Sequence, residues 1–171
     1  MATWNVRTLH QKGKLENVVQ EMERMKRNIL GLADVRWTGV DSMKLGSKTL
    51  IYSGGHTHER VVGILFDVKT AKSLWSWCSI SDRVVVPKLI AKPLNLGIIQ
   101  VYAPTSDSED VEVETFYEEI GKAKGYLKSQ DIIIVMGDFN AKVGNERVED
   151  VVGPSGIGTV NERGRRMVPN Q

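Results

Sequence analysis

Short apolar runs of strand character recur along the sequence, and only two stretches have the spacing of a helix. The first stretch, from Leu15 to Met25, repeats apolar residues every three or four positions, which predicts one buried helical stripe. The second, from Val113 to Leu127, has the same spacing, with glutamates near its start and lysines near its end, as the helix dipole favours. Strands outnumber helices, since we predict them at Ile29–Ala33, Thr49–Tyr52, Val61–Phe66, Val84–Ile90, Leu96–Val101 and Ile132–Met136.

The last of these runs, Ile132–Met136, is apolar at every position. A run without alternation predicts a strand buried on both faces, with a helix or a second sheet over each side. We therefore expect a fold of α/β or α+β layers. The first strand is marginal, because only Met1–Trp4 precede the polar Asn5, and this leaves open that residues upstream are missing.

Length and composition favour one ordinary globular domain over residues 1–171. With 41% hydrophobic and 26% charged residues, the chain does not fit a disordered, collagen-like or coiled-coil protein. Its one cysteine, Cys78, permits no intrachain disulfide, so we expect a reducing compartment, the nucleus or the cytoplasm. No apolar run approaches the roughly 20 residues of a membrane span, so we expect no membrane partner. The net charge of +2 is too small to indicate a nucleic-acid partner by itself.

Four of the apolar runs end in a polar residue suited to phosphate or to a hard metal ion. They lead to Asn5, to Asp34, to Tyr102, and to the pair Asp138 and Asn140. If these strands are neighbours in a sheet, their ends meet at one rim. Layered α/β proteins place binding sites at such rims, because the loops there expose polar groups. The sequence therefore predicts that these side chains lie close together.

The tetrapeptide Gly137–Asn140 is the most informative of these segments. In an extended backbone, Asp138 and Asn140 point to the same side, and Phe139 points back into the core. The carboxylate can then take a proton from an attacking water or lie near a metal ion, and the amide can bind a phosphate oxygen. A simple turn is the alternative, and for the tetrapeptide taken alone it is the commoner case.

Each of the other candidates also has a plainer structural explanation. Asp34 could ligate Mg²⁺, or it could bond to a neighbouring backbone amide. Asn5 could position a phosphate or the water around a metal, or it could satisfy loose backbone groups at the end of a strand. Tyr102 precedes Ala103 and Pro104, and the proline fixes the direction of the chain there, which suits an aimed hydroxyl. A half-buried tyrosine at the edge of a sheet is the commoner case.

Two further groups of residues have weaker signals. The pair His56 and His58 lacks a third ligand nearby, so we do not expect a zinc site there. Near the C-terminal end of the sequence, Arg163, Arg165 and Arg166 could contact phosphates, but a frayed terminus explains them as well.

Five motifs follow one another at distances that resemble those of a known family. They are Thr3–Leu9 (TWNVRTL), Val35–Gly39 (VRWTG), Val101–Thr105 (VYAPT), Gly137–Gly144 (GDFNAKVG) and Asn161–Gly164 (NERG). With these motifs the chain is similar to the endonuclease/exonuclease/phosphatase superfamily, in the branch of apurinic-endonuclease-like domains of non-LTR retrotransposons of the RTE (BovB) type. The resemblance spans essentially the whole chain, and five ordered motifs are far more specific than any one of them.

This resemblance implies a four-layer α/β sandwich with two packed mixed sheets, and hydrolysis of a DNA phosphodiester with Mg²⁺ or Mn²⁺. It implies that Asn5 and Asp34 lie at the metal, with Asn5 also near the phosphate. By the same resemblance, Tyr102 contacts the phosphate. Asp138 orients or deprotonates the water, and Asn140 acts beside it.

The sequence also departs from the family. Asp34 stands where the family usually has Glu, one methylene longer, so ligation of Mg²⁺ could become water-mediated. Asn161 is a weaker match to a substrate-contacting asparagine, and the family's later Trp-Ser-Pro-Asp-Gly segment and Asp-His pair have no counterpart before Gln171. Losing such groups costs orders of magnitude in rate, so we expect weak or absent cleavage. Without late strands, we also expect an open sheet edge that favours self-association.

Two other functions stay open at this point. A catalytically degenerate domain could serve as a binding module for nucleic acid or protein. A relative within the same superfamily could instead act as a phosphatase on small phosphoesters.

Overall fold

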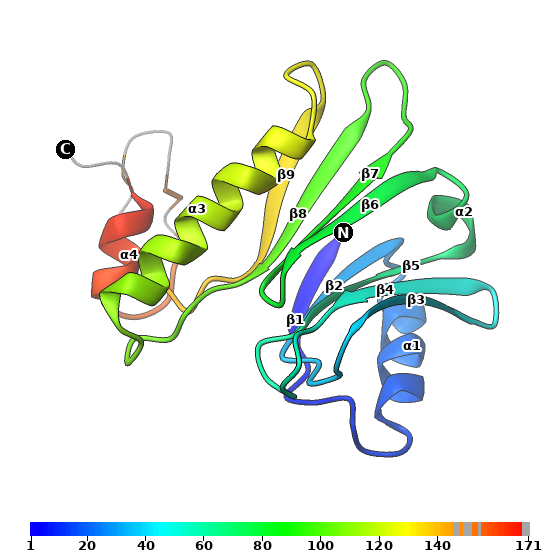
Figure 1. Cartoon of the computed structure of the whole chain (residues 1–171), viewed down its shortest axis with the longest axis horizontal. Coiled ribbons are helices and arrows are strands. Elements are labelled where there is room, and N and C mark those ends of the chain that lie inside the picture. The colour runs from blue at the N-terminus through cyan, green and yellow to red at the C-terminus, as the bar shows by residue number, and fades with distance from the viewer. Residues whose placement is uncertain (146–147, 149–151, 154, 169–171) are drawn as a thin grey trace.

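In the computed structural model, which describes residues 1–145, 148, 152–153 and 155–168, two β-sheets pack face to face (Figure 1). The first sheet has five strands in the order β1-β2-β5-β4-β3, and the second has four in the order β6-β7-β8-β9. Both sheets are mixed, because β1 runs parallel to β2 and β8 parallel to β9, whereas the other pairs are antiparallel. The strands are β1 (Ala2–Asn5), β2 (Ile29–Ala33), β3 (Val40–Leu45), β4 (Lys48–Ser53), β5 (Val62–Phe66), β6 (Leu74–Ser81), β7 (Val84–Leu89), β8 (Leu96–Tyr102) and β9 (Ile132–Asp138).

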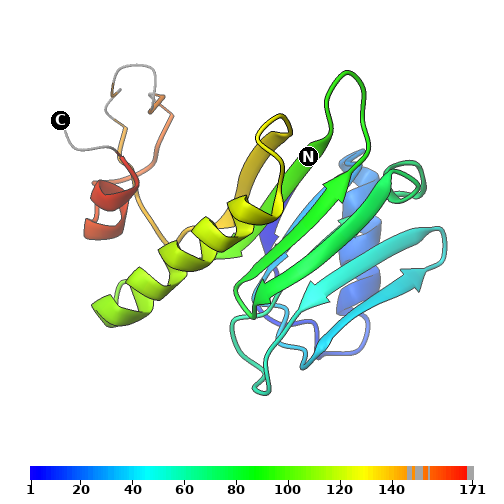
Figure 2. The same ribbon diagram turned by 45° about the horizontal axis from the view of Figure 1, so that its top comes forward.

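The two long helices form the outer layers, on opposite sides of the paired sheets (Figure 2). Helix α1 (Lys14–Arg24) covers the first sheet with the predicted stripe, of which Val18 and Met22 are buried. Helix α3 (Asp110–Tyr126) covers the second sheet in the same way. The four-layer α/β sandwich implied by the family resemblance is thus confirmed. Two short helices, α2 (Val68–Ala71) and α4 (Glu162–Met167), complete the described elements.

Strand residues alternate between the layers, as the two-residue period of a strand requires. In β5, Ile64 faces the core between the two sheets, whereas Leu65 faces the core under α1. In β8, Ile98 faces the core between the sheets, and Ile99 faces the core under α3. The sheets are therefore fixed to each other by an apolar layer, together with a buried hydrogen bond from Gln100 Nε2 to the carbonyl oxygen of Leu32. This layer sets the relative positions of the strand ends.

The prediction that Ile132–Met136 is buried on both faces is wrong. The run does form most of β9, but this strand lies at the edge of the second sheet, with β8 as its only strand neighbour among the described residues. Ile132 is 48% exposed and Ile133 37% exposed. Apolar composition indicates a strand but not its place in a sheet, because pairing depends on distant segments.

The other differences are local. Strands β3 and β6 lie outside the predicted runs, because polar residues interrupt their apolar positions. The spacing predicts Leu127 on the helical face, but Leu127 is the C-cap of α3 and has an extended backbone; its side chain is buried as predicted. None of the helices in the described ranges is long and apolar enough to cross a membrane.

Candidate functional site

The two parallel strand pairs bring the predicted polar residues to the same rim of the sandwich. Asn5 is the last residue of β1 and pairs with Ala33, so that Asp34 follows directly on the neighbouring strand. In the second sheet, Tyr102 at the end of β8 pairs with Asp138 at the end of β9. Carboxyl ends of parallel strands lie at one edge, which is why residues far apart in the sequence gather here.

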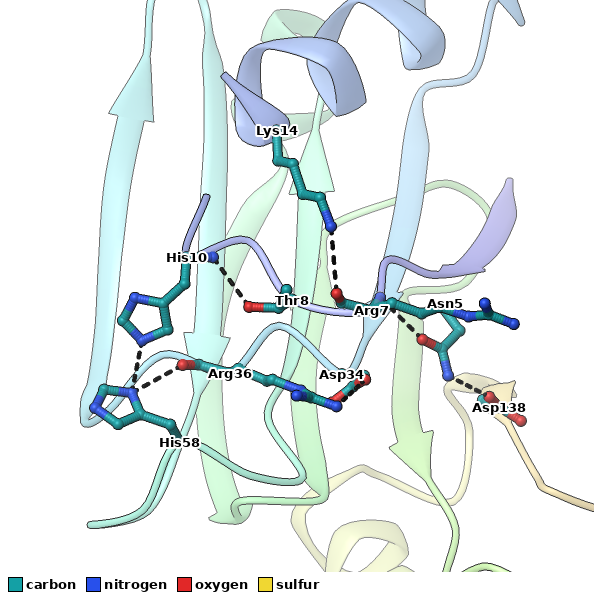
Figure 3. Close-up of polar contacts among 9 residues, drawn as sticks. All are labelled: Asn5, Arg7, Thr8, His10, Lys14, Asp34, Arg36, His58 and Asp138. Carbon is teal, nitrogen blue, oxygen red and sulfur yellow. Dashed lines mark hydrogen bonds and ion pairs between the residues drawn. The ribbon is translucent and has the colours of Figure 1, made fainter. Parts of the chain in front are cut away.

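A hydrogen bond between Asn5 and Asp138 joins the two sheets at this rim. Asn5 Nδ2 donates to Asp138 Oδ2 over 2.8 Å, as Figure 3 shows. The other carboxylate oxygen, Oδ1, accepts from the backbone N–H of Asn140 over 3.0 Å. The carboxylate is thereby held in one orientation, and the Asn5 side chain is itself positioned by a 3.1 Å bond from the backbone N–H of Arg7 to its Oδ1.

The position of Asp138 at the rim depends on the close approach of β9 to β8 at Gly137. Gly137 has φ 149°, and a Cβ built on it would lie 2.0 Å from the carbonyl oxygen of Val101. An L side chain does not fit there without moving the backbone. The glycine that precedes Asp138 is therefore required for the geometry of the site.

Both interpretations of the tetrapeptide Gly137–Asn140 are partly correct. The backbone is not extended throughout, because β9 ends at Asp138 and Asn140 has φ 47°, which is a turn conformation. Nevertheless, Asp138 and Asn140 line the same cavity; Phe139 also borders this cavity, and it packs against the core under α3 as well. Asn140 is fixed by its Nδ2, which donates to the carbonyl oxygen of Ala103 over 2.7 Å.

The Tyr102 hydroxyl lies within the electrostatic influence of both carboxylates of the site. Burial raises the pKa of its hydroxyl, and the nearby carboxylates of Asp34 and Asp138 raise this pKa further. A hydrogen bond with Asn140 and the charge of Arg83 offset part of this increase. The hydroxyl therefore stays protonated at neutral pH and is available as a hydrogen-bond donor.

Asp34 has a partner that no pattern in the sequence indicates, the guanidinium of Arg36. Both of its carboxylate oxygens accept from the guanidinium of Arg36: Nε donates to Oδ1 over 2.8 Å and Nη2 to Oδ2 over 3.1 Å. The Asp34 side chain is 10% exposed, whereas that of Arg36 is 50% exposed. The backbone is left-handed at both residues, with φ 58° and φ 64°. Neither periodicity nor strand ends indicate this pair, since it arises from the local shape of the loop after β2.

The site is hollowed into two adjoining cavities, which share Thr105 in their linings. The larger, of about 1050 Å³, contains Asn5, Asp138, Asn140 and Asn161 in its lining. The smaller, of about 270 Å³, is lined by Asp34, Arg36, Glu59, Arg60, Arg83, Tyr102, Thr105 and Ser108. The structure therefore brings the predicted residues to one region but divides them, with Asp34 and Tyr102 on one side of the boundary.

Asn161 has a structural role in addition to its place in the cavity. It is the N-cap of α4, where its Oδ1 accepts from the backbone N–H groups of Gly164, over 2.8 Å, and Lys142, over 2.9 Å. Its Nδ2 donates to the carbonyl oxygen of Asn140 over 3.5 Å. The loop after β9 is thus tied to α4.

The arginines near the end of the sequence lie in a helix, and two of them contact other segments. They belong to α4, and Arg163 is buried and donates to the carbonyl oxygen of Ser108 over 2.7 Å. Arg166 forms ion pairs with Asp110 and Glu114 on α3. These two side chains therefore fasten α4 to α3, and this role explains them without a phosphate.

The oxygen-rich set of side chains suits a hard divalent cation. Within the residues that the structure describes, no three His, Cys, Asp or Glu side chains gather closely enough to hold a metal by themselves. Mg²⁺ commonly binds through one or two carboxylates and keeps several waters. The carboxylates of Asp34 and Asp138 and the amide oxygen of Asn5 are ligands of the chemical type that Mg²⁺ prefers.

Comparison with known proteins gives relatives by sequence and by fold. No family model matches the chain. It is 36% identical over 169 residues to craniofacial development protein 2 of Bos taurus, which covers 98% of this chain and 28% of that protein. The same protein of Tragulus javanicus is 35% identical over 98% of this chain and 29% of its own length. The chain thus spans less than a third of these curated relatives.

Three solved structures illustrate the likeness in fold. An AP endonuclease of Leishmania major has a TM-score of 0.61 at 14% identity, over 86% of this chain and 57% of that one. The endonuclease domain of TRAS1, a telomere-specific non-LTR retrotransposon, has a TM-score of 0.59 at 14% identity, over 96% and 67%. TDP2 of D. rerio, complexed with single strand DNA product, has a TM-score of 0.56 at 11% identity, over 81% and 59%.

Proposed function

We propose that this chain, a homologue of craniofacial development protein 2 with the fold of the endonuclease/exonuclease/phosphatase family, hydrolyses phosphodiester bonds in DNA with Mg²⁺ or Mn²⁺. The observation that supports this most is the Asn5–Asp138 hydrogen bond, which fixes a carboxylate of one sheet against an amide of the other at the edge of an open cavity. A turn or a loosely satisfied strand end does not require this long-range pairing.

The fixed carboxylate of Asp138 is suited to act as the acceptor of a proton from water. Both of its oxygens already accept a hydrogen bond, so its orientation is set before the substrate arrives. In this proposal, the protonated hydroxyl of Tyr102 donates to a phosphate oxygen, and Asn140 acts beside Asp138. Asn161, whose side chain lies beside the backbone of Asn140 in the lining of the same cavity, contacts the substrate.

In this proposal, Asp34 and Asn5 supply the protein oxygens that hold the cation, and Asp138 lies beside them as the acceptor of the proton. When bound, the cation supplies positive charge that stabilises the negative charge developing on the phosphate. We propose slow turnover, for two reasons. Among the described residues, no histidine lines either cavity. In addition, both oxygens of Asp34 are engaged by Arg36.

A plasmid-nicking assay tests this function. Supercoiled DNA is incubated with the protein in Mg²⁺, in Mn²⁺ and in EDTA, and open-circular product is measured. We expect slow, cation-dependent nicking that Asp138→Ala reduces to background. The matched control is Asp107→Ala, which removes an exposed carboxylate from the same cavity. Within the described part of the chain, the one hydrogen bond of this carboxylate comes from the adjacent Ser106, so the variant should nick at about the wild-type rate.

The other outcomes decide between the alternatives. No nicking by the wild-type protein, together with retained binding of labelled duplex DNA, refutes the nuclease and indicates a binding module. Release of phosphate from small phosphoesters without nicking indicates a phosphatase. Rapid nicking that Asp138→Ala abolishes confirms the nuclease and contradicts the slow turnover.

A further inference from the structure

The guanidinium of Arg36 is hydrogen-bonded to Oδ1 and Oδ2 of Asp34, the two oxygens that a cation at Asp34 would need as ligands. Its Nε and Nη2 bond one to each carboxylate oxygen, which is the paired geometry that gives arginine–carboxylate bonds their strength. The Asp34 side chain is almost fully enclosed, at 10% exposure, so its charge requires a compensating partner. In this state, Arg36 is that partner.

The arrangement of Arg36 allows its side chain to move while its backbone stays in place. The carbonyl oxygen of Arg36 accepts from Nδ1 of His58 over 2.9 Å, and this nitrogen also lies 2.7 Å from Nε2 of His10 (Figure 3). The backbone carbonyl of Arg36 is therefore held by the loop that carries His58, and His10 contacts the same His58 ring. The guanidinium end, by contrast, belongs to a side chain that is half exposed and lines the smaller cavity.

The smaller cavity has room for an anion that could become a second partner of the Arg36 guanidinium. Arg60 and Arg83 line it as well, and both pair with Glu112. Tyr102 lies on the same wall. A group that carries negative charge and enters this cavity would meet Arg36 as soon as Asp34 no longer holds it, because the side chain is long and flexible.

We infer that Arg36 is an exchangeable counter-ion of Asp34: it competes with the divalent cation for this carboxylate, and a bound cation releases it to a phosphate of the DNA. This inference rests on the proposed function. A doubly charged cation on Asp34 repels the guanidinium at short range and also makes it unnecessary as a compensating charge. Cation binding and phosphate binding are thereby coupled through one side chain.

Competition of this kind weakens the apparent affinity for the cation by the fraction of molecules in which Asp34 is free. Replacing the guanidinium by a neutral amide removes the competitor. We expect Arg36→Gln to bind Mn²⁺ about five to ten times more tightly than the wild type. Any lost positive charge near the site raises cation affinity, so the measurement needs a control with the same change of charge.

Arg60→Gln is that control. Arg60 lines the same cavity, its side chain is 46% exposed against 50% for Arg36, and it pairs with Glu112 rather than with Asp34. Mn²⁺ binding is measured for the wild type and both variants by electron paramagnetic resonance of the free ion. Arg36→Gln should gain at least threefold more affinity than Arg60→Gln. In an Asp34→Asn background this difference should disappear, because the shared carboxylate is gone.

DNA binding gives the second measurement. Binding of a labelled duplex is followed by fluorescence anisotropy in EDTA and in Ca²⁺, and thermal melts confirm that each variant is folded. The wild type should bind DNA more tightly in Ca²⁺, and Arg36→Gln should lose most of this gain while Arg60→Gln keeps more of it. Arg36→Lys, which keeps the charge without the paired geometry, should lie between wild type and Arg36→Gln in Mn²⁺ affinity.

The results separate this inference from the proposed function. Equal Mn²⁺ affinities for Arg36→Gln and Arg60→Gln overturn the exchange, even if the wild-type protein nicks DNA. An absence of Mn²⁺ binding in all variants also overturns it. If the expected Mn²⁺ pattern is found and no nicking occurs, the exchange stands and the nuclease proposal fails.

Discussion

Gly137→Ala is the substitution that most directly tests how the fold builds the site. A Cβ at this position would lie 2.0 Å from the carbonyl oxygen of Val101 and 2.8 Å from its carbonyl carbon, which are backbone atoms that cannot rotate away. The residue also has φ 149°, which L side chains rarely adopt. Backbone strain and overpacking each cost about 1–3 kcal/mol, so we expect a loss of about 3 kcal/mol or more in the free energy of unfolding.

For a chain of this length, that loss corresponds to a melting temperature lower by about 6–12 °C. Thermal unfolding followed by circular dichroism measures it. Gly121→Ala is the matched control, because Gly121 lies within α3 with nothing near its built Cβ. Alanine is the better helix former by about 1 kcal/mol, so the control should raise the melting temperature by about 2–4 °C. If both substitutions shift the melting temperature equally, the close approach of β9 to β8 is refuted.

Three further predictions concern the Asn5–Asp138 hydrogen bond, the carboxylate of Asp131 and the open edge of β9. Asn5→Ala removes the hydrogen bond from Asn5 to Asp138, and it should lower the free energy of unfolding, measured in urea, by about 1 kcal/mol. The same variant should also nick DNA more slowly than the wild type, because the orientation of the Asp138 carboxylate is no longer fixed. Bonds from Lys88 and from the backbone of Lys128 lower the pKa of Asp131, so this carboxylate stabilises the fold above its unfolded pKa and loses that effect as the pH falls through its folded pKa. Asp131→Asn should therefore lower the melting temperature at pH 7 and make little difference in strong acid; an equal deficit at both pH values contradicts this. Self-association through the open edge of β9 stays a prediction: sedimentation velocity should show oligomers that Ile133→Lys reduces, and a monomeric wild-type protein refutes it.

Much of the fold follows from local patterns in the sequence. The apolar stripe from Leu15 to Met25 becomes α1, and the run Ile29–Ala33 becomes β2 with the predicted ends. Such elements are predictable because their periodicity is set by the residues themselves and by the layer that covers them. The polar residues at the ends of four strands lie at one rim of the sandwich, as predicted, because the end of a strand is visible in the sequence wherever an apolar run stops.

Tertiary structure alone decided which of these residues meet. The bond between Asn5 and Asp138 joins positions 133 residues apart, and no local pattern specifies that distance. The same is true of β9, whose apolar run gave no sign that it lies at an edge. The pairing of Asp34 with Arg36 depends on two left-handed residues in one loop. Contacts of this kind arise from the packing of two sheets against each other, a cooperative property of the whole chain rather than of any segment.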